Sequence, residues 1–239
     1  MADTKNTTSP KRDEGRQKSH AGVALVGAAL GLSILALAVP RLTSAVIALD
    51  SREVLSSLRD GQPIDAARQS AALADLERAS AWVADGELAL DRGYLLMQQA
   101  DAAADVQTRA ALRRQAIAAT AAGLALSPSQ PSAWARLAAL RAAENDRQGA
   151  ADALRLSMLT GAVAPALMAS RLNLGLSLLP ELDRDTTEQL RRQVRLTWAI
   201  SPDIVGEMAQ RPATGRFVVE ALNTMSDSDV DRYVQLHGK

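Results

Sequence analysis

The sequence predicts an all-α protein, in which one N-terminal transmembrane helix precedes an array of stacked helical hairpins, an α-solenoid. Three observations predict this fold. Residues 21–39 are largely apolar and carry no charge. After Pro40 the chain lacks the alternation of apolar and polar residues that is typical of strands. Prolines, glycines and polar residues divide this remainder into helix-sized pieces, in which small residues recur at a regular interval.

The composition restricts both the core and the function. Apolar residues make up 47% of the chain but aromatic residues only 3%, so the core must consist mostly of alanine and leucine, which suit closely packed helices. The 27 basic and 27 acidic residues balance; the absence of a long-range positive field argues against nucleic acid as a partner. The chain has no cysteine, which excludes disulfides, thiolate metal ligands and a cysteine nucleophile.

Residues 1–20 are predicted to be a polar tail and residues 21–40 a transmembrane helix. A helix over 21–39 is roughly 28 Å long, close to the hydrocarbon thickness of a bilayer. Basic residues are more frequent in the tail than in the twenty residues after Pro40. This bias places the N-terminus in the cytoplasm and the C-terminal domain in the periplasm, on a single-pass anchor in a bacterial inner membrane.

The apolar segment leaves two alternatives open. Small residues in Ala36-Leu37-Ala38 and in Thr43-Ser44-Ala45 suit a signal peptidase, so a cleaved signal peptide is the alternative to an anchor. Gly27 and Gly31 form a GxxxG pattern, which would let two membrane helices pack closely in a homodimer. An anchor rich in alanine and glycine, without any partner, accounts for the same two residues.

Residues 41–62 are predicted to continue as a helical neck. Val54 and Leu55 would pack against the domain that follows, whereas Arg52 and Glu53 would remain in solvent, because this spacing gives a helix one apolar face. Turn residues then separate further helices. The neck would thus be a rigid connection and not a loose linker.

The clearest repeat unit covers residues 131–164. Trp134, Leu137 and Ala138 would begin the first helix of the unit. Ala150 would lie where the second helix crosses the first. Two helices can cross closely only where both contribute small side chains, so the unit is predicted to be a tight helical hairpin.

A second unit, residues 97–130, shares this register. Ala104 and Ala116 lie about 34 residues before the matching alanines, and Pro128 closes the unit. This spacing resembles the tetratricopeptide repeat. The resemblance implies that residues 63–239 form a tetratricopeptide-like domain, whose stacked hairpins build an extended concave surface for binding proteins.

A longer stretch, about residues 110–200, is similar to the VpsP-type polysaccharide biosynthesis proteins. The resemblance implies an accessory role in the synthesis or export of envelope exopolysaccharide, and it brings no catalytic residue. The segments that carry it are Ala125-Leu126-Ser127-Pro128, Ser132-Ala133-Trp134-Ala135-Arg136-Leu137-Ala138, Leu154-Arg155-Leu156-Ser157-Met158-Leu159-Thr160-Gly161, Ser170-Arg171-Leu172-Asn173-Leu174-Gly175-Leu176, Arg192-Gln193 and Trp198.

The sequence therefore favours a membrane-anchored scaffold that binds proteins, most simply components of polysaccharide synthesis or export, and that uses no cofactor or metal ion. A scaffold for another envelope assembly pathway remains open.

His20 and His237 are the only histidines, so neither a catalytic triad nor a histidine metal site is expected. The enzymatic alternative is a glycan hydrolase or lyase that uses two carboxylates. Candidate pairs are Asp183 with Asp185, Glu144 with Asp146, and Asp227 with Asp229, each at a predicted helix end, where aspartate commonly caps.

Four arginines are the candidate partner-binding residues. Arg191, Arg192 and Arg195 form a basic strip on one predicted helix, and Glu188 lies four residues before Arg192, a favourable spacing for an ion pair. Together with Arg171, the strip could meet an acidic partner or an anionic polymer, because arginine pairs bidentately with carboxylates. A solvated helix face is the alternative interpretation of the strip.

Overall fold

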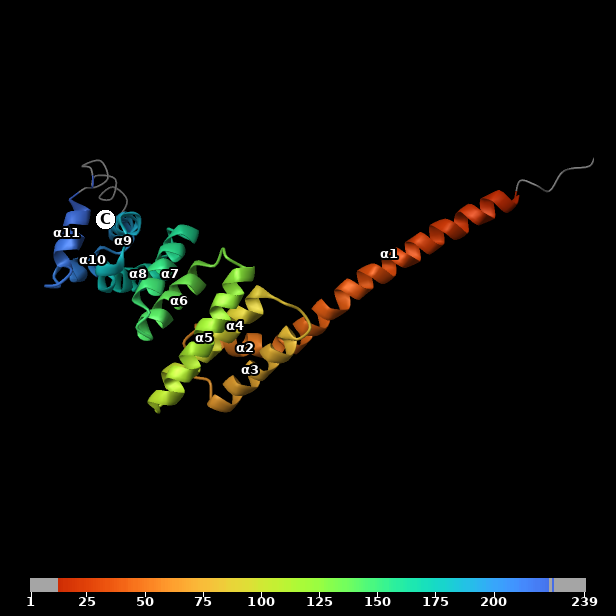
Figure 1. The fold of residues 1–239 in the computed structure, drawn as a ribbon, viewed down its shortest axis with the longest axis horizontal. Helices are drawn as coiled ribbons and strands as arrows, with labels where there is room; N and C mark the ends of the chain where they lie inside the picture. The colour runs from red at the N-terminus through yellow and green to blue at the C-terminus, as the bar shows by residue number, and fades with distance from the viewer. Residues whose placement is uncertain (1–12, 224, 226–239) are drawn as a thin grey trace, which may run out of the picture.

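A computed structural model describes residues 13–223 and 225, with side chains from residue 26 onward. Across these residues the chain is helical and contains no strand (Figure 1), which confirms the all-α prediction. The helices are α1 (Asp13–Ile47), α2 (Leu49–Arg59), α3 (Ala66–Ser80), α4 (Gly86–Ala102), α5 (Val106–Leu126), α6 (Pro131–Ala143), α7 (Arg147–Thr160), α8 (Pro165–Ser177), the 3-10 helix η1 (Leu179–Glu181), α9 (Arg184–Ile200), α10 (Pro202–Ala209) and α11 (Gly215–Leu222).

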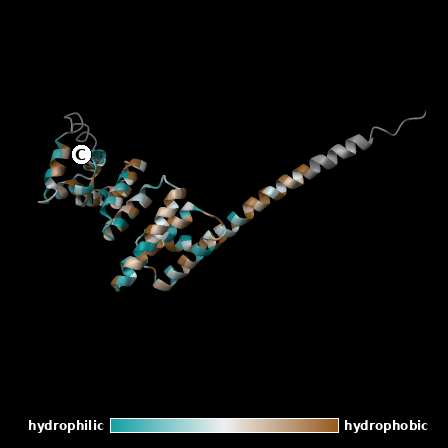
Figure 2. Cartoon of the chain, in the orientation of Figure 1, coloured by the Kyte–Doolittle hydropathy of each residue, from teal (hydrophilic) through white to brown (hydrophobic). Residues whose placement is uncertain are grey.

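Helix α1 extends away from the other helices (Figure 1). Its segment Val26–Ile47 is long and apolar enough to cross a membrane, and only 6% of its most apolar part is buried. Figure 2 shows this segment as a hydrophobic stretch without a covering layer of protein. It is consistent with a single membrane span or a signal sequence. Around Gly27 and Gly31 no other side chain lies within 4 Å of where a Cβ atom would be.

Helix α1 is longer than the predicted transmembrane segment at both ends, and its continuation past Pro40 agrees with the predicted helical neck. Helix α1 already begins at Asp13, within the predicted polar tail, and it continues through Pro40 to Ile47. Proline removes one backbone hydrogen bond from a helix but does not always end it. The helix is accordingly continuous where the apolar segment meets the domain.

The predicted neck is part of the domain. Its residues form the last turns of α1 and the whole of α2. Ser44 and Ala48 are buried, as are Val54 and Leu55 on α2. Ala48, Val54 and Leu55 pack with alanines and a leucine of α3 and with leucines of α4. Arg52 and Glu53 are exposed, as predicted.

The helices pack mainly against their neighbours in the sequence and follow one another along the molecule (Figure 1). The hairpin of α6 and α7 agrees with the repeat predicted for 131–164. Leu137, Ala138 and Ala150 are almost entirely buried between its two helices. The indole N–H of Trp134 donates a hydrogen bond to the carbonyl of Pro128, 2.8 Å away, which fixes the entry of the chain into α6.

The register predicted for the preceding unit, 97–130, is wrong at Ala104. This residue is exposed in the loop between α4 and α5, so it cannot form a helix crossing. Helices α4 and α5 have 17 and 21 residues, whereas α6 and α7 have 13 and 14. A fixed step of 34 residues assumes units of equal length and therefore misses the start of α4. Ala116, in contrast, is completely buried at the contact of α4 and α5.

Glycines, and not Ala104, bring α4 and α5 together. A Cβ atom on Gly123 would lie 2.8 Å from the carbonyl oxygen of Gly86 and 2.7 Å from Cγ of Leu90. A Cβ atom on Gly93 would lie 3.1 Å from the backbone nitrogen of Thr120. These separations are shorter than normal contacts of a side-chain carbon, so the two backbones touch at a distance that larger residues do not permit.

Aspartates begin many of the helices. Each accepts a hydrogen bond from a backbone N–H of the first turn, which would otherwise have no partner. The capping residues are Asp65, Asp85, Asp105, Asp146 and Asp183.

Replacing Gly123 by alanine tests the contact of α4 and α5. The added methyl group has no space, so we expect a loss of about 1–3 kcal/mol in the free energy of unfolding. The matched control is Gly206→Ala in α10, where nothing lies within 4 Å of the new atom and a gain of about 0.5–1 kcal/mol is expected from helix propensity. Thermal unfolding followed by circular dichroism measures both. Equal behaviour of the two variants would contradict the close contact.

Candidate functional site

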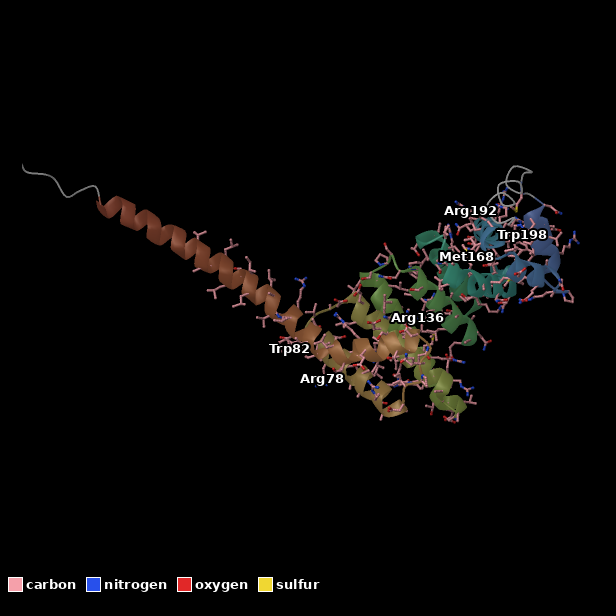
Figure 3. All side chains as sticks on the ribbon, turned by 180° about the vertical axis from the view of Figure 1, so that it is seen from behind. Arg78, Trp82, Arg136, Met168, Arg192 and Trp198 are labelled. Atoms are coloured by element: carbon pink, nitrogen blue, oxygen red, sulfur yellow. The ribbon has the colours of Figure 1, made fainter. Side chains whose placement is uncertain are left out.

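A polar cavity of about 230 Å³ lies where α2, α4 and α6 meet. The end of α2 contributes one arginine, α4 contributes two carboxylates, and the start of α6 contributes polar residues and a second arginine. Its lining residues are Arg59, Glu87, Leu90, Asp91, Gln130, Ser132, Ala133 and Arg136. Figure 3 shows Arg136 in the middle of the helical array.

Tyr94 organises the two arginines. The guanidinium carbon of Arg59 lies 5.8 Å from the centre of the Tyr94 ring, and that of Arg136 lies 5.1 Å from it. Both distances are in the range of cation–π contacts. Tyr94 thus brings together two positive groups that would otherwise repel each other.

Asp91 balances one of these arginines. Its carboxylate forms an ion pair with Arg59 at 2.6 Å. Burial nevertheless raises the pKa of Asp91 above its ordinary value, although the charge of Arg59 acts in the opposite direction. The carboxylate of Asp91 is therefore partly shielded from water and is already bound to Arg59.

Arg136 is the less satisfied of the two arginines. Burial lowers its pKa to about 10, so it still carries its charge at neutral pH. Its Nη1 donates a hydrogen bond to the carbonyl of Leu90 at 2.8 Å. It makes no ion pair with any residue that the structure describes. Since a guanidinium has five N–H donors, Arg136 retains capacity to bind a carboxylate or another planar anion in the cavity.

The prediction that Arg171 lies on a partner-binding surface is wrong. Only 1% of this residue is exposed. Its guanidinium donates to the Ser157 carbonyl at 2.6 Å, to the Ser157 hydroxyl at 3.0 Å and to the Gly161 carbonyl at 2.7 Å. These carbonyls lie at the C-terminal end of α7, where backbone acceptors lack helical partners and the helix dipole favours a cation.

Arg171 thereby connects three helices. The Ser157 hydroxyl, which accepts from Arg171, itself donates to the carbonyl of Pro131 at 2.6 Å. Pro131 begins α6, Ser157 belongs to α7 and Arg171 to α8. Burial lowers the pKa of Arg171, yet the carbonyls compensate for the water that it loses. Its role is to hold the array together.

The basic strip on α9 is largely engaged within the protein. Glu188 pairs with Arg191 at 3.3 Å and with Arg195 at 3.4 Å. The predicted pair of Glu188 with Arg192 is therefore replaced by these two. Arg191 also lies over the ring of Phe217 at 5.3 Å. Arg192 is exposed and borders a cavity of about 170 Å³ between α7 and α9. A partner-binding role for these three arginines stays a prediction.

The candidate carboxylate pairs have mainly structural contacts. Asp146 and Asp183 cap α7 and α9, and hydrogen bonds from Thr186 lower the pKa of Asp183. Glu144 lies 3.8 Å from Arg114. The pair Asp227 and Asp229 and the histidine at 237 lie outside the described residues, and no group of three potential metal ligands occurs within them.

Replacing Arg171 by methionine should destabilise the protein by about 2–4 kcal/mol, because the two carbonyls at the end of α7 would lose their donor in a buried site. Arg192→Met is the matched control, since an exposed substitution usually changes stability by less than about 0.5 kcal/mol. Urea unfolding of the solubilised protein measures the difference. If both variants unfold at the same urea concentration, Arg171 does not hold these helices together.

Comparisons with protein-family models, with curated proteins and with solved structures found no match to this chain.

Proposed function

We propose that this protein is a membrane-anchored scaffold, in which α1 spans the bacterial inner membrane and a tetratricopeptide-like α-solenoid binds a partner protein in the periplasm. The exposed apolar segment of α1 supports the anchor. The sequential packing of the helices supports the solenoid, because repeat arrays contact chiefly their nearest neighbours. Such arrays offer an extended surface and not a closed catalytic pocket.

The observation that carries the proposal is the charge of Arg136, which makes no ion pair within the described residues; the carboxylate that attracts it, Asp91, is itself paired with Arg59. This guanidinium is partly desolvated in a polar cavity and makes one hydrogen bond to a carbonyl. Attraction to Asp91 offsets only part of the cost of burying Arg136, and a buried cation whose charge is incompletely matched lowers stability. A partner that supplies the carboxylate would offset this cost on binding and would place an acidic side chain or a C-terminal carboxylate against Arg136.

The location of the cavity also fits a protein partner. It is bordered by α2, α4 and α6, which are the first helices of successive pairs along the array. In a helical-repeat array such helices commonly form one continuous face, on which an extended segment can lie across several units. The formal net charge of zero makes a nucleic acid an unsuitable ligand for this face.

The pathway is proposed from the resemblance to VpsP-type proteins, which implies exopolysaccharide synthesis or export. A scaffold for another envelope assembly pathway would have the same cavity and anchor. The genes beside this one distinguish the two. Glycosyltransferase and polysaccharide-export genes favour exopolysaccharide, whereas translocase or cytochrome assembly genes favour the other pathway.

One observation favours an enzyme instead. Asp91 has a raised pKa and shares its cavity with Glu87, and glycan hydrolases use two carboxylates of unequal acidity. Against this, Asp91 is paired with Arg59, and both guanidiniums cover the Tyr94 ring that could otherwise stack on a sugar. Release of sugar from the polymer by wild type, lost in Asp91→Asn, would establish the enzyme.

Arg136→Gln should reduce the amount of partner crosslinked to the full-length protein in native membranes at least about tenfold, because the partner carboxylate loses its charged donor. Arg136→Lys keeps the charge but loses the planar donor pair, so an intermediate loss is expected. Arg216→Gln, whose side chain is 91% exposed on α11, is the matched control. Unchanged capture by Arg136→Gln, at unchanged thermal stability, would refute the site.

The orientation can be tested directly because the chain contains no cysteine. In spheroplasts, a thiol reagent that cannot cross the inner membrane should label Ser129→Cys, in the exposed turn before α6, but not Ser9→Cys in the tail. Permeabilisation should make Ser9→Cys reactive. The labelled protein should keep its full mass and stay with the membrane. The reverse labelling pattern would contradict the orientation, and a shortened soluble product would indicate a cleaved signal peptide.

A further inference from the structure

The foot of α1, where this helix enters the domain, carries a second candidate site. The side chains of α1 are exposed from residue 26 up to about residue 42, whereas Ser44 and Ala48 are buried in the domain. The domain therefore begins in the last helical turn of the apolar segment Val26–Ile47. If α1 spans the membrane, the groups around its foot must lie at the level of the lipid headgroups.

Two arginines share a cavity at this level. Arg41 follows the end of the charge-free segment, and Arg52 projects from α2. Both line a cavity of about 120 Å³ between α1, α2 and the start of α4. Within the described part of the chain, neither side chain makes an ion pair or a hydrogen bond. Asp85 borders the same cavity, but its Oδ1 accepts from the backbone N–H groups of Glu87 and Leu88 as the cap of α4.

An exposed tryptophan lies beside this cavity. Trp82 is 53% exposed in the loop between α3 and α4, and the next residue, Val83, lines the cavity together with Arg41. Figure 1 shows this loop against the end of α1, and Figure 3 places Trp82 there. Leu42 and Leu49 are exposed nearby, by 65% and 56%. Tryptophan at such a place is typical of the membrane interface, because its ring is apolar and its N–H is polar.

We infer that Arg41, Arg52 and Trp82 form a site for the phosphate of an anionic phospholipid headgroup in the leaflet that faces the domain. The two guanidiniums bind the phosphate oxygens, and Trp82 lies at the boundary between headgroups and acyl chains. This inference rests on the membrane anchor of the proposed function, but not on the partner site at Arg136.

Charge and position both favour a lipid over other anions. Positive residues next to a membrane helix are less frequent on the exported side, so two unpaired arginines at that place require a local reason. Each arginine near a membrane surface attracts anionic lipid by roughly 1 kcal/mol, which corresponds to about fivefold enrichment. Arginine also matches the geometry of phosphate oxygens better than lysine. A free phosphate would bind the same groups, so the test must separate the two.

Quenching of Trp82 fluorescence by brominated lipid measures this enrichment. The full-length protein is reconstituted in phosphatidylcholine vesicles that contain a small fraction of either brominated phosphatidylglycerol or brominated phosphatidylcholine. We expect several-fold stronger quenching by the brominated phosphatidylglycerol. Arg41→Gln with Arg52→Gln should make the two lipids quench equally. Arg192→Gln with Arg216→Gln, at the far end of the array, should keep the preference.

Two further arms make the result specific. Trp82→Phe gives the signal of Trp134 and Trp198, which lie on α6 and α9 away from the foot, and should show little quenching by either lipid. Inorganic phosphate at millimolar concentration should leave the preference unchanged. Loss of the preference in phosphate would overturn the lipid in favour of a soluble ligand.

Equal quenching of wild type by the two brominated lipids would overturn the headgroup site, and so would the absence of quenching in protein that remains bound to the vesicles. Failure of the anchor itself has a different signature, because the protein would then separate from the vesicles on flotation. Failure of partner binding is independent of both, since it is measured with Arg136 variants.

Discussion

Helices α4 and α5 touch where Gly93 and Gly123 leave no space for a Cβ atom, and much of the molecule depends on this contact. Helix α4 contributes Leu88 and Leu95 to the cluster of buried residues around α2 and α3, and Leu90 to the cluster around α6 and α7. It is therefore the element through which the two clusters are joined. Because interiors are close-packed, a shift of α4 away from α5 would disturb both clusters. It would also move Asp91, which lines the candidate site, and Tyr94, which contacts its two arginines.

Arg171 and Arg136 both have little exposure to solvent, but they differ in how far the fold compensates for the water that they lose. Arg171 gives its donors to two carbonyls and a hydroxyl, so its desolvation is compensated within the fold. Arg136 is also desolvated, but it makes one hydrogen bond to a carbonyl and no ion pair with a described residue. A buried charge that the fold matches only in part is therefore a better indicator of a binding site than the most exposed charge, since a ligand can supply the missing partner.

Sequence patterns predict the helices and the hairpin of α6 and α7, because Trp134, Ala138 and Ala150 all lie within one hairpin, where their spacing depends on local sequence alone. These patterns fail where tertiary contacts determine the position of a residue. Ala104 lies in a loop because the hairpins differ in length. Arg171 is buried because its hydrogen-bond acceptors lie at the end of a different helix, α7. The candidate site has no sequence signature at all. Its arginines, 59 and 136, and the tyrosine between them belong to three helices, and only the packing of α4 brings them together.

The absence of a linker between α1 and the domain restricts how a partner can bind. Ser44 lies on α1, Ala48 joins α1 to α2, and both are buried in the domain, so the domain cannot turn freely about the apolar segment. A flexible linker would let the domain sample many heights and orientations above a membrane. Here, if α1 spans the bilayer, the cavity of Arg136 keeps a fixed height and direction relative to the foot, because both cavities are lined by residues of α2 and α4. A partner in the same membrane must then present its carboxylate at that height, and the protein selects partners by geometry as well as by charge.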